Sequence, residues 1–174
     1  MVTQFYTASS LDGFIATEDN SLEWLFRQDI DMDGPMAYPA FGAEKGALAM
    51  GATTYEWIVE NNETWDYISP TWVFTHRELP AKKGGGDVHF TQAAIADVHR
   101  EMTEAAAGKN IWLLGGGDLV GQFADAGLLD EVWVQFAPVT LGSGAPLLPR
   151  ALDLELVEVA RNRDFMCGRY NVVR

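Results

Sequence analysis

Cysteine and histidine are both scarce in this sequence. Cys167 is the single cysteine in 174 residues, which excludes an internal disulfide and a zinc site built on several cysteines. His76, His89 and His99 are the three histidines, and their spacing does not match that of metal ligands. We therefore expect no metal site.

Positive charge and long apolar runs are lacking too. The sequence has 12 Lys and Arg residues and 25 Asp and Glu residues, so the formal net charge is −13. Such a surface repels nucleic acid and anionic membranes, and we expect neither as a partner. An anionic cofactor is not excluded, because backbone dipoles and one or two cations can hold one. No run approaches membrane-spanning length and no leader pattern precedes the first apolar run, so we expect a cytoplasmic protein.

The sequence does contain apolar runs that alternate with helical patterns. With 48% hydrophobic residues in 174, the chain is long enough for one domain, residues 1–174, with a substantial core. This alternation predicts an α/β fold with a mostly parallel central sheet, and the last two strands should form an antiparallel hairpin. The strands are expected at 2–8, 47–50, 71–75, 88–90, 111–114, 132–136, 152–159 and 166–173.

Local signals place the helices and loops between these strands. Pro35 is expected to begin a helix that ends near Gly46 and turns Met36, Phe41 and Ala43 towards the core. Thr91 is the expected N-cap of a helix that runs to about residue 107. Short helices should also follow the turns at 51–54 and 115–117. Residues 82–87 should form a flexible surface turn, and the glycine- and proline-rich stretch 138–148 a loop.

Three consecutive glycines, 115–117, lie between a buried strand and a helix. Backbone without side chains can approach a ligand closely, and the helix N-terminus offers unpaired N–H groups, so this turn suits a phosphate. The turn is neither a P-loop, because no Lys-Ser/Thr follows, nor a dinucleotide fingerprint, because Val120 replaces the third glycine. A tight turn without a ligand is the alternative. Asp118 is expected to cap the helix.

Several segments together are similar to the C-terminal reductase domain of the riboflavin biosynthesis protein RibD, within the dihydrofolate reductase-like superfamily. They cover nearly the whole chain in the family's order. The resemblance implies a three-layer sandwich with helices on both faces of the sheet. The segments are Ser10-Leu11-Asp12-Gly13-Phe14-Ile15-Ala16, Trp24, Met50-Gly51-Ala52-Thr53-Thr54-Tyr55-Glu56, Leu114-Gly115-Gly116-Gly117, Leu129-Asp130-Glu131-Val132 and Pro138-Val139-Thr140-Leu141-Gly142-Ser143-Gly144.

The resemblance also implies NADPH as the hydride donor, with the diphosphate on the glycine turn and on the Gly51 turn. Ala52 stands where dihydrofolate reductases commonly carry the arginine that holds the 2′-phosphate. Arg77 is the expected substitute, although it equally fits an ordinary solvated arginine. Ala8, Ile15 and Trp24 would give the nicotinamide an apolar face. The full set of expected cofactor-binding residues is Ala8, Ile15, Gly51, Thr53, Thr54, Thr75, Arg77, Leu114, Gly115, Gly116, Gly117, Asp118 and Leu119.

The substrate is less well defined by the resemblance. Trp24 and Tyr38 are the expected substrate contacts, and Asp12 is the expected proton source, with Asp29 behind it; an Asp-Gly turn is the alternative for Asp12. The riboflavin reductases typically carry a substrate-contacting glutamate where Gly115 stands. They also hold a ribose phosphate with arginines, whereas the stretch between Trp24 and Ala49 offers only Arg27 and Lys45 among several acids.

Three hypotheses follow. The first is an NADPH-dependent reductase, nominally 5-amino-6-(5-phosphoribosylamino)uracil reductase, acting on a small molecule. The second is dihydrofolate reductase-type activity, and the third is a nucleotide-binding protein without turnover. Relatives of this type commonly form homodimers, and Phe136, Phe165 and Tyr170 would supply an aromatic dimer surface; filling the core is the alternative for these side chains.

Overall fold

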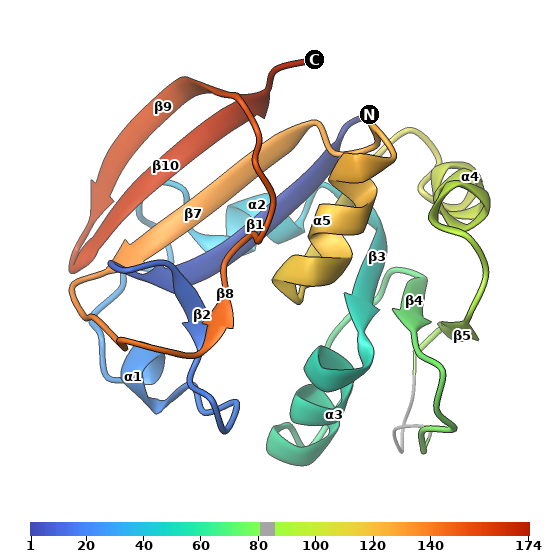
Figure 1. Ribbon diagram of the computed structural model, residues 1–174, viewed down its shortest axis with the longest axis horizontal. Coiled ribbons are helices and arrows are strands. Elements are labelled where there is room, and N and C mark those ends of the chain that lie inside the picture. The colour runs from blue at the N-terminus through green and yellow to red at the C-terminus, as the bar shows by residue number, and fades with distance from the viewer. Residues whose placement is uncertain (81–85) are drawn as a thin grey trace.

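The computed structural model describes residues 1–80 and 86–174, and these residues build a central eight-stranded sheet (Figure 1). Across the sheet the strand order is β5-β4-β3-β6-β1-β7-β10-β9. The strands are β1 (Thr3–Ser10), β3 (Lys45–Gly51), β4 (Thr71–Phe74), β5 (Val88–Thr91), β6 (Asn110–Gly115), β7 (Glu131–Ala137), β9 (Leu154–Asn162) and β10 (Phe165–Val172).

The sheet is parallel except at one edge. Neighbouring strands from β5 to β7 pair in parallel. β10 runs antiparallel to both β7 and β9. The expected mostly parallel sheet with an antiparallel C-terminal hairpin is confirmed.

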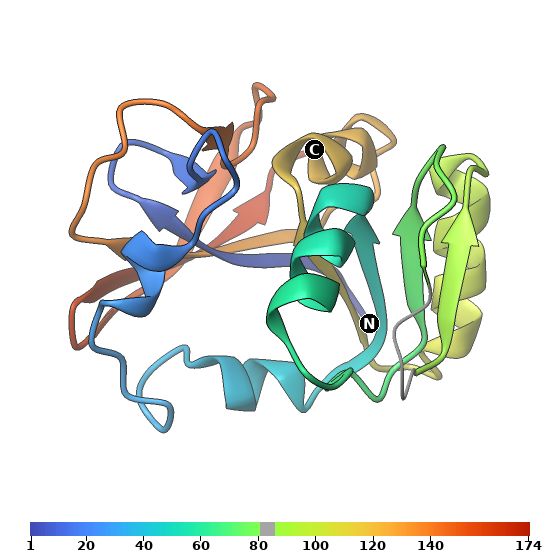
Figure 2. The same ribbon diagram turned by 90° about the horizontal axis from the view of Figure 1, so that it is seen from below.

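Helices cover both faces of the sheet, as expected. Successive residues of β3 alternate between the faces: Ala47 and Ala49 pack into the core under α4 (Ile95–Ala105) and α5 (Gly117–Asp125). Leu48 and Met50 point to the other face, which carries α2 (Tyr38–Gly42) and α3 (Ala52–Asn61). Figure 2 shows α5 and α2 on opposite sides of the sheet.

A second, two-stranded sheet pairs β2 (Phe14–Ala16) with β8 (Ala145–Pro146). β8 lies inside the stretch 138–148, which the sequence predicted as loop. Backbone hydrogen bonds fasten this stretch to the β1–β2 turn, from Leu11 N to Val139 O (2.7 Å) and from Leu147 N to Gly13 O (2.9 Å). The two segments therefore form one unit beside the end of β1. α1 (Glu23–Phe26) follows β2.

Two local predictions were wrong. Instead of a helix over residues 35–46, the chain forms the shorter α2, because Met36 takes a positive φ of 56° and β3 already begins at Lys45. Phe41 is buried as expected, but Ala43 is exposed and Met36 only partly buried. Thr91 is the last residue of β5 rather than a helix cap, and the N-cap of α4 is Ala94.

The surface turn predicted at 82–87 lies mostly outside the described residues. Within the described ranges no helix is both long and apolar enough to cross a membrane. Across the same ranges, no three His, Cys, Asp or Glu side chains gather in the way that a metal ion requires.

A buried polar network lies on the α2 face of the sheet. Glu131 accepts hydrogen bonds from Gln4 Nε2 (2.7 Å) and Arg169 Nη2 (2.8 Å). Lys45 donates to Gln4 Oε1, and its ammonium lies 3.6 Å from the centroid of the Phe41 ring. Burial lowers the pKa of Lys45 to about 8, because desolvation disfavours the charged form.

Candidate functional site

The strand order creates a crevice between β3 and β6. These neighbours are parallel, but β3 leads into α3 on one face and β6 into α5 on the other. Where adjacent strands send their helices to opposite faces, ligands bind outside the carboxyl ends of the strands. A cavity of about 670 Å³ lies there, within the size range of small-molecule sites.

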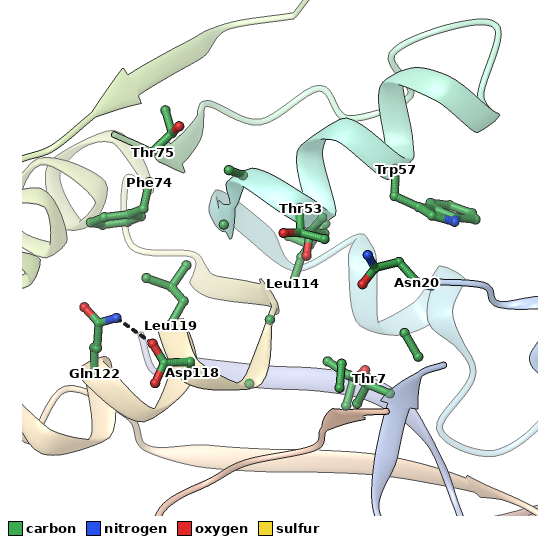
Figure 3. A pocket seen from close by; sticks show the side chains of 18 of the residues that line it. Thr7, Asn20, Thr53, Trp57, Phe74, Thr75, Leu114, Asp118, Leu119 and Gln122 are labelled. Carbon is green, nitrogen blue, oxygen red and sulfur yellow. Dashed lines mark hydrogen bonds between the residues drawn. The ribbon is translucent and has the colours of Figure 1, made fainter. Parts of the chain in front are cut away.

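The cavity collects most of the residues expected to bind the cofactor. It is lined by the ends of several strands and the beginnings of α3, α4 and α5, as Figure 3 shows for ten labelled side chains. Ala8, Arg77 and Gly115 are not among the lining residues. Those that line it are Ile15, Gly51, Thr53, Thr54, Thr75, Leu114, Gly116, Gly117, Asp118 and Leu119.

Three helix N-termini open onto this cavity. The N-caps of α3, α4 and α5 are Gly51, Ala94 and Gly116, and none of them makes a side-chain capping hydrogen bond. The prediction that Asp118 caps α5 was wrong, because Asp118 lies inside the first turn. Its carboxylate accepts hydrogen bonds from Gln122 (3.0 Å) and Arg150 (3.1 Å). The positive ends of the helix dipoles remain directed at the cavity.

The three glycines of the turn serve different purposes. Gly115 has a φ of 128°, a conformation that side chains disfavour. A Cβ at Gly117 would lie 2.4 Å from the carbonyl oxygen of Pro146, so close packing requires this glycine. Neither reason applies to Gly116, whose φ is −70° and whose Cβ would meet nothing within 4 Å. The fold explains the first and last glycines but leaves the middle one, which lines the cavity, without a packing role.

Cations are missing from the cavity wall. Among its described lining residues there is no Lys or Arg. Arg77 lies next to the lining residues Thr75 and His76, but its guanidinium pairs with both carboxylate oxygens of Glu56, at 2.9 and 2.8 Å. An anion in the cavity would therefore be held by backbone dipoles and hydroxyl groups.

The residues expected near the nicotinamide and substrate are divided between the cavity and the core. Ile15 lines the cavity. Trp24 is only 4% exposed and packs in a core cluster with Phe165 and Cys167, against which Ala8 also lies. Tyr38 is 39% exposed and outside the cavity, with its ring 5.5 Å from that of Trp112 on the α2 face.

The two expected acids also lie outside the cavity lining. Asp12 accepts hydrogen bonds from Ser10 Oγ (2.6 Å) and from the amides of Leu141 (3.0 Å) and Gly142 (2.7 Å). The Ser10 hydroxyl is the largest of the influences that lower the pKa of Asp12 to about 2. Asp29 has an exposed side chain that lies 3.8 Å from Arg163.

Several lining residues were not identified from the sequence. Trp57 lies on α3 one turn beyond Thr53, and its helical spacing from that residue was the available signal. The segment 91–95 begins at the last residue of β5 and so lies at the same edge of the sheet as the glycine turns. The other lining residues that were not identified are Thr7, Ala16, Asn20, Leu22, Ala52, Phe74, His76, Gln122, Ala145 and Pro146.

The structure is that of an α/β protein with a cavity at the switch point of its sheet. The family model of the RibD C-terminal domain matches residues 52–164, and the chain belongs to this family. It is 35% identical to YwjB of Bacillus subtilis over 149 residues, covering 83% of this chain and 81% of YwjB. It is 26% identical to YyaP of the same organism over 174 residues, covering 95% and 90% of the two chains.

Solved structures show the same fold. A protein from Shewanella sp. PV-4 described as a putative riboflavin biosynthesis protein superposes with a TM-score of 0.84 at 24% identity, over 100% of both chains. The Thermotoga maritima diaminohydroxyphosphoribosylaminopyrimidine deaminase/5-amino-6-(5-phosphoribosylamino)uracil reductase superposes with a TM-score of 0.66 at 13% identity. That match covers 99% of this chain and 56% of the Thermotoga chain.

Proposed function

We propose that this protein is an NADPH-dependent reductase of the RibD C-terminal domain type that acts on a small molecule. One observation carries the proposal: Gly51 and Gly116, neither needed as glycine by its φ or its packing, face each other at the cavity. Each is the N-cap of a helix without a side-chain cap. Two positive helix ends and a side-chain-free backbone suit a diphosphate.

The residues around these glycines fit the remaining parts of the cofactor. Thr53 and Thr54 stand in the first turn of α3 and line the cavity, so their hydroxyls are available to phosphate oxygens. Leu114 and Leu119 supply apolar wall on the β6 side. The cavity is lined both by Thr7 of β1 and by Ile95 at the start of α4, so it offers room for both ends of a dinucleotide.

Bound NADPH would supply a hydride, and the protein would position the reactants and exclude water. Thr7 and Ile15 line the end of the cavity at β1 and β2, where we place the nicotinamide. Asp12 does not suit the role of proton donor, because its carboxylate is held ionised by three hydrogen-bond donors. We assign it a positioning role instead: it fixes the loop that carries Leu141 and Gly142 beside that end.

Cofactor titrations test the proposal. NADPH should raise the melting temperature and quench the tryptophan fluorescence, since Trp57 lines the cavity. Absence of any stabilisation by NADPH or NADH would contradict it. Cofactor oxidation with dihydrofolate alone would favour the dihydrofolate reductase alternative. Binding without oxidation on a panel of dihydrofolate and pyrimidine substrates would favour a nucleotide-binding protein without turnover.

We also propose that the protein is a cytoplasmic homodimer. Of the expected aromatic surface, Phe165 is unsuitable because it is 2% exposed, and Phe136 and Tyr170 are only partly exposed. The register of the β9–β10 hairpin instead places Leu156, Val159 and Met166 on one face, and these side chains are 58, 64 and 50% exposed. An apolar face of this kind, on the edge of a sheet, suits a second copy of the chain.

A further inference from the structure

A second cavity, of about 550 Å³, lies between the segment 19–26 and helix α3. It shares Asn20, Leu22, Thr53 and Trp57 with the cavity that we assign to the cofactor. The two cavities are therefore neighbours with common walls. Adjacent cavities let a reductase hold a cofactor and a substrate side by side.

An aromatic surface is exposed in this second cavity. The rings of Phe26 and Trp57 are stacked, with centroids 5.9 Å apart and an interplanar angle of 28°. Both residues line the cavity, and Phe26 is 66% exposed. An exposed pair of stacked rings offers planar, apolar area to which another planar ring adds with little loss of conformational entropy.

The charge of the second cavity is negative. Asp19, Glu23, Glu56 and Glu60 line it, and its described lining includes no Lys or Arg. The nearby guanidinium of Arg77 is paired with Glu56. A phosphate dianion in this cavity would lie near several carboxylates, with no cation in the described lining to compensate their charge. Repulsion between like charges within one cavity is only partly screened at physiological salt.

We infer that the second cavity is the substrate subsite, and that it takes a planar heterocycle that is neutral or cationic and carries no phosphate. The inference rests on the proposed function. It separates this chain from the Thermotoga enzyme, which is named as a reductase of a phosphoribosyl compound. Trp57 and Phe26 supply the stacking surface. The carboxylates of Asp19, Glu23 and Glu60, which unlike Glu56 are not paired with Arg77, set the charge that the substrate can carry.

A matched pair of probes tests the inference: 5-amino-6-(ribosylamino)uracil and its 5′-phosphate, titrated by calorimetry into protein saturated with NADP⁺. The unphosphorylated probe should bind at least about tenfold more tightly, and the ratio should fall as salt is added. In the double variant E23K/E60K the ratio should shrink to about threefold or less, because the repulsion becomes attraction. Glu23 and Glu60 are exposed, so these changes leave the core intact.

E104K is the control, because Glu104 is an exposed carboxylate on α4 outside both cavities; it should keep the wild-type ratio. Trp57→Ala should weaken both probes by about tenfold or more. Equal or tighter binding of the phosphate would overturn the inference, and so would binding of NADP⁺ with neither probe. If NADP⁺ itself fails to bind, the proposed function is wrong. The ratio of the affinities of the two probes, measured without cofactor, then still tests whether the second cavity is the subsite.

Discussion

Gly51 and Gly116 bring the backbones of two helix N-termini into contact: a Cβ at Gly51 would lie 3.8 Å from the amide nitrogen of Gly116. The two residues come from adjacent parallel strands whose helices lie on opposite faces of the sheet. A ligand that lies across both N-termini would meet both helix dipoles at once. We therefore propose this contact as the place where the anionic part of a cofactor binds.

Gly116→Val should abolish cofactor binding and leave the fold intact. The new side chain has open space within the protein, since a Cβ at this position meets nothing within 4 Å, but it would occupy the cavity. We expect NADPH affinity to fall by about a hundredfold or more, as close steric exclusion of a ligand predicts, with an unchanged circular dichroism spectrum. Unchanged affinity would show that the diphosphate binds elsewhere.

Gly117→Ala is the matched control for that variant. Its Cβ would lie 2.4 Å from Pro146 O and 2.5 Å from Leu147 O, which forces the backbone apart. We expect a loss of about 1–3 kcal/mol in the free energy of unfolding, as for other overpacked sites. Urea denaturation of both variants would measure the difference, and equal stabilities would contradict the assignment of separate roles to the two glycines.

Glu56→Gln should increase the preference for NADPH over NADH. In the structure Glu56 holds the Arg77 guanidinium through two hydrogen bonds, and the loss of its charge would free the guanidinium for a 2′-phosphate. We expect the ratio of the two dissociation constants to change by about 1.5-fold to fivefold, the range of an exposed charge pair. Glu60→Gln, one turn further along α3, is the control. An unchanged ratio in Glu56→Gln would exclude Arg77 as the anchor.

The sequence predicted the sheet, its hairpin and the glycine turns, because apolar runs and consecutive glycines are local signals. It did not predict that the Asp118 carboxylate would accept hydrogen bonds from Gln122 and Arg150, because Arg150 lies 32 residues further along the chain than Asp118. The short α2 was missed although a local signal was present. Pro39 disfavours the interior of a helix that begins at Pro35, and in the structure it stands in the first turn of α2 instead.

The cavity lining was easiest to anticipate where it is made of backbone. Gly51 and Gly116 stand at the ends of buried strands, and parallel strands end at one edge of the sheet, so strand prediction places both glycines at that edge. Only the structure shows that β3 and β6 are neighbours. The positions of Trp24 and Tyr38 were harder to predict, because the sequence does not distinguish a large aromatic side chain in the core from one that lines a cavity. Their packing depends on Phe165 and Trp112, which are distant in the chain.

Asp12→Asn should lower kcat by much less than the hundredfold or so that loss of a general acid costs. The pH profile of activity between about pH 5 and 9 should keep its shape, because the pKa of Asp12 is about 2. The pKa of Asp12 in the folded protein lies below the ordinary pKa of an aspartate. Asp12 therefore stabilises the fold at pH values above that ordinary pKa, and this contribution is lost as the pH falls through 2. Urea denaturation at pH 6 and pH 3 would measure that loss. A displaced pH profile would restore Asp12 as the proton donor.

The stability of the protein should rise with pH in one alkaline window because of Lys45. Burial lowers its pKa from 10.5 to about 8, so the unfolded chain binds more protons than the folded one between these values. The free energy of unfolding should increase by about 1–3 kcal/mol from pH 8 to pH 10 relative to Lys45→Met. Measuring both proteins removes the contribution of Tyr6 and Tyr67, whose pKa values are raised by burial. If the free energies of unfolding of the wild type and Lys45→Met changed in parallel with pH, this prediction would be wrong.

The double variant Leu156→Glu/Val159→Glu should convert the proposed dimer into a monomer. Both side chains are more than half exposed on one face of the β9–β10 hairpin, and four carboxylates would face one another across a two-fold interface. Light scattering coupled to gel filtration should give about half the wild-type mass. Ile68→Glu is the control, because Ile68 is 99% exposed in the loop before β4, away from that hairpin. A monomeric wild-type protein, or a variant that remains dimeric, would exclude this face as the interface.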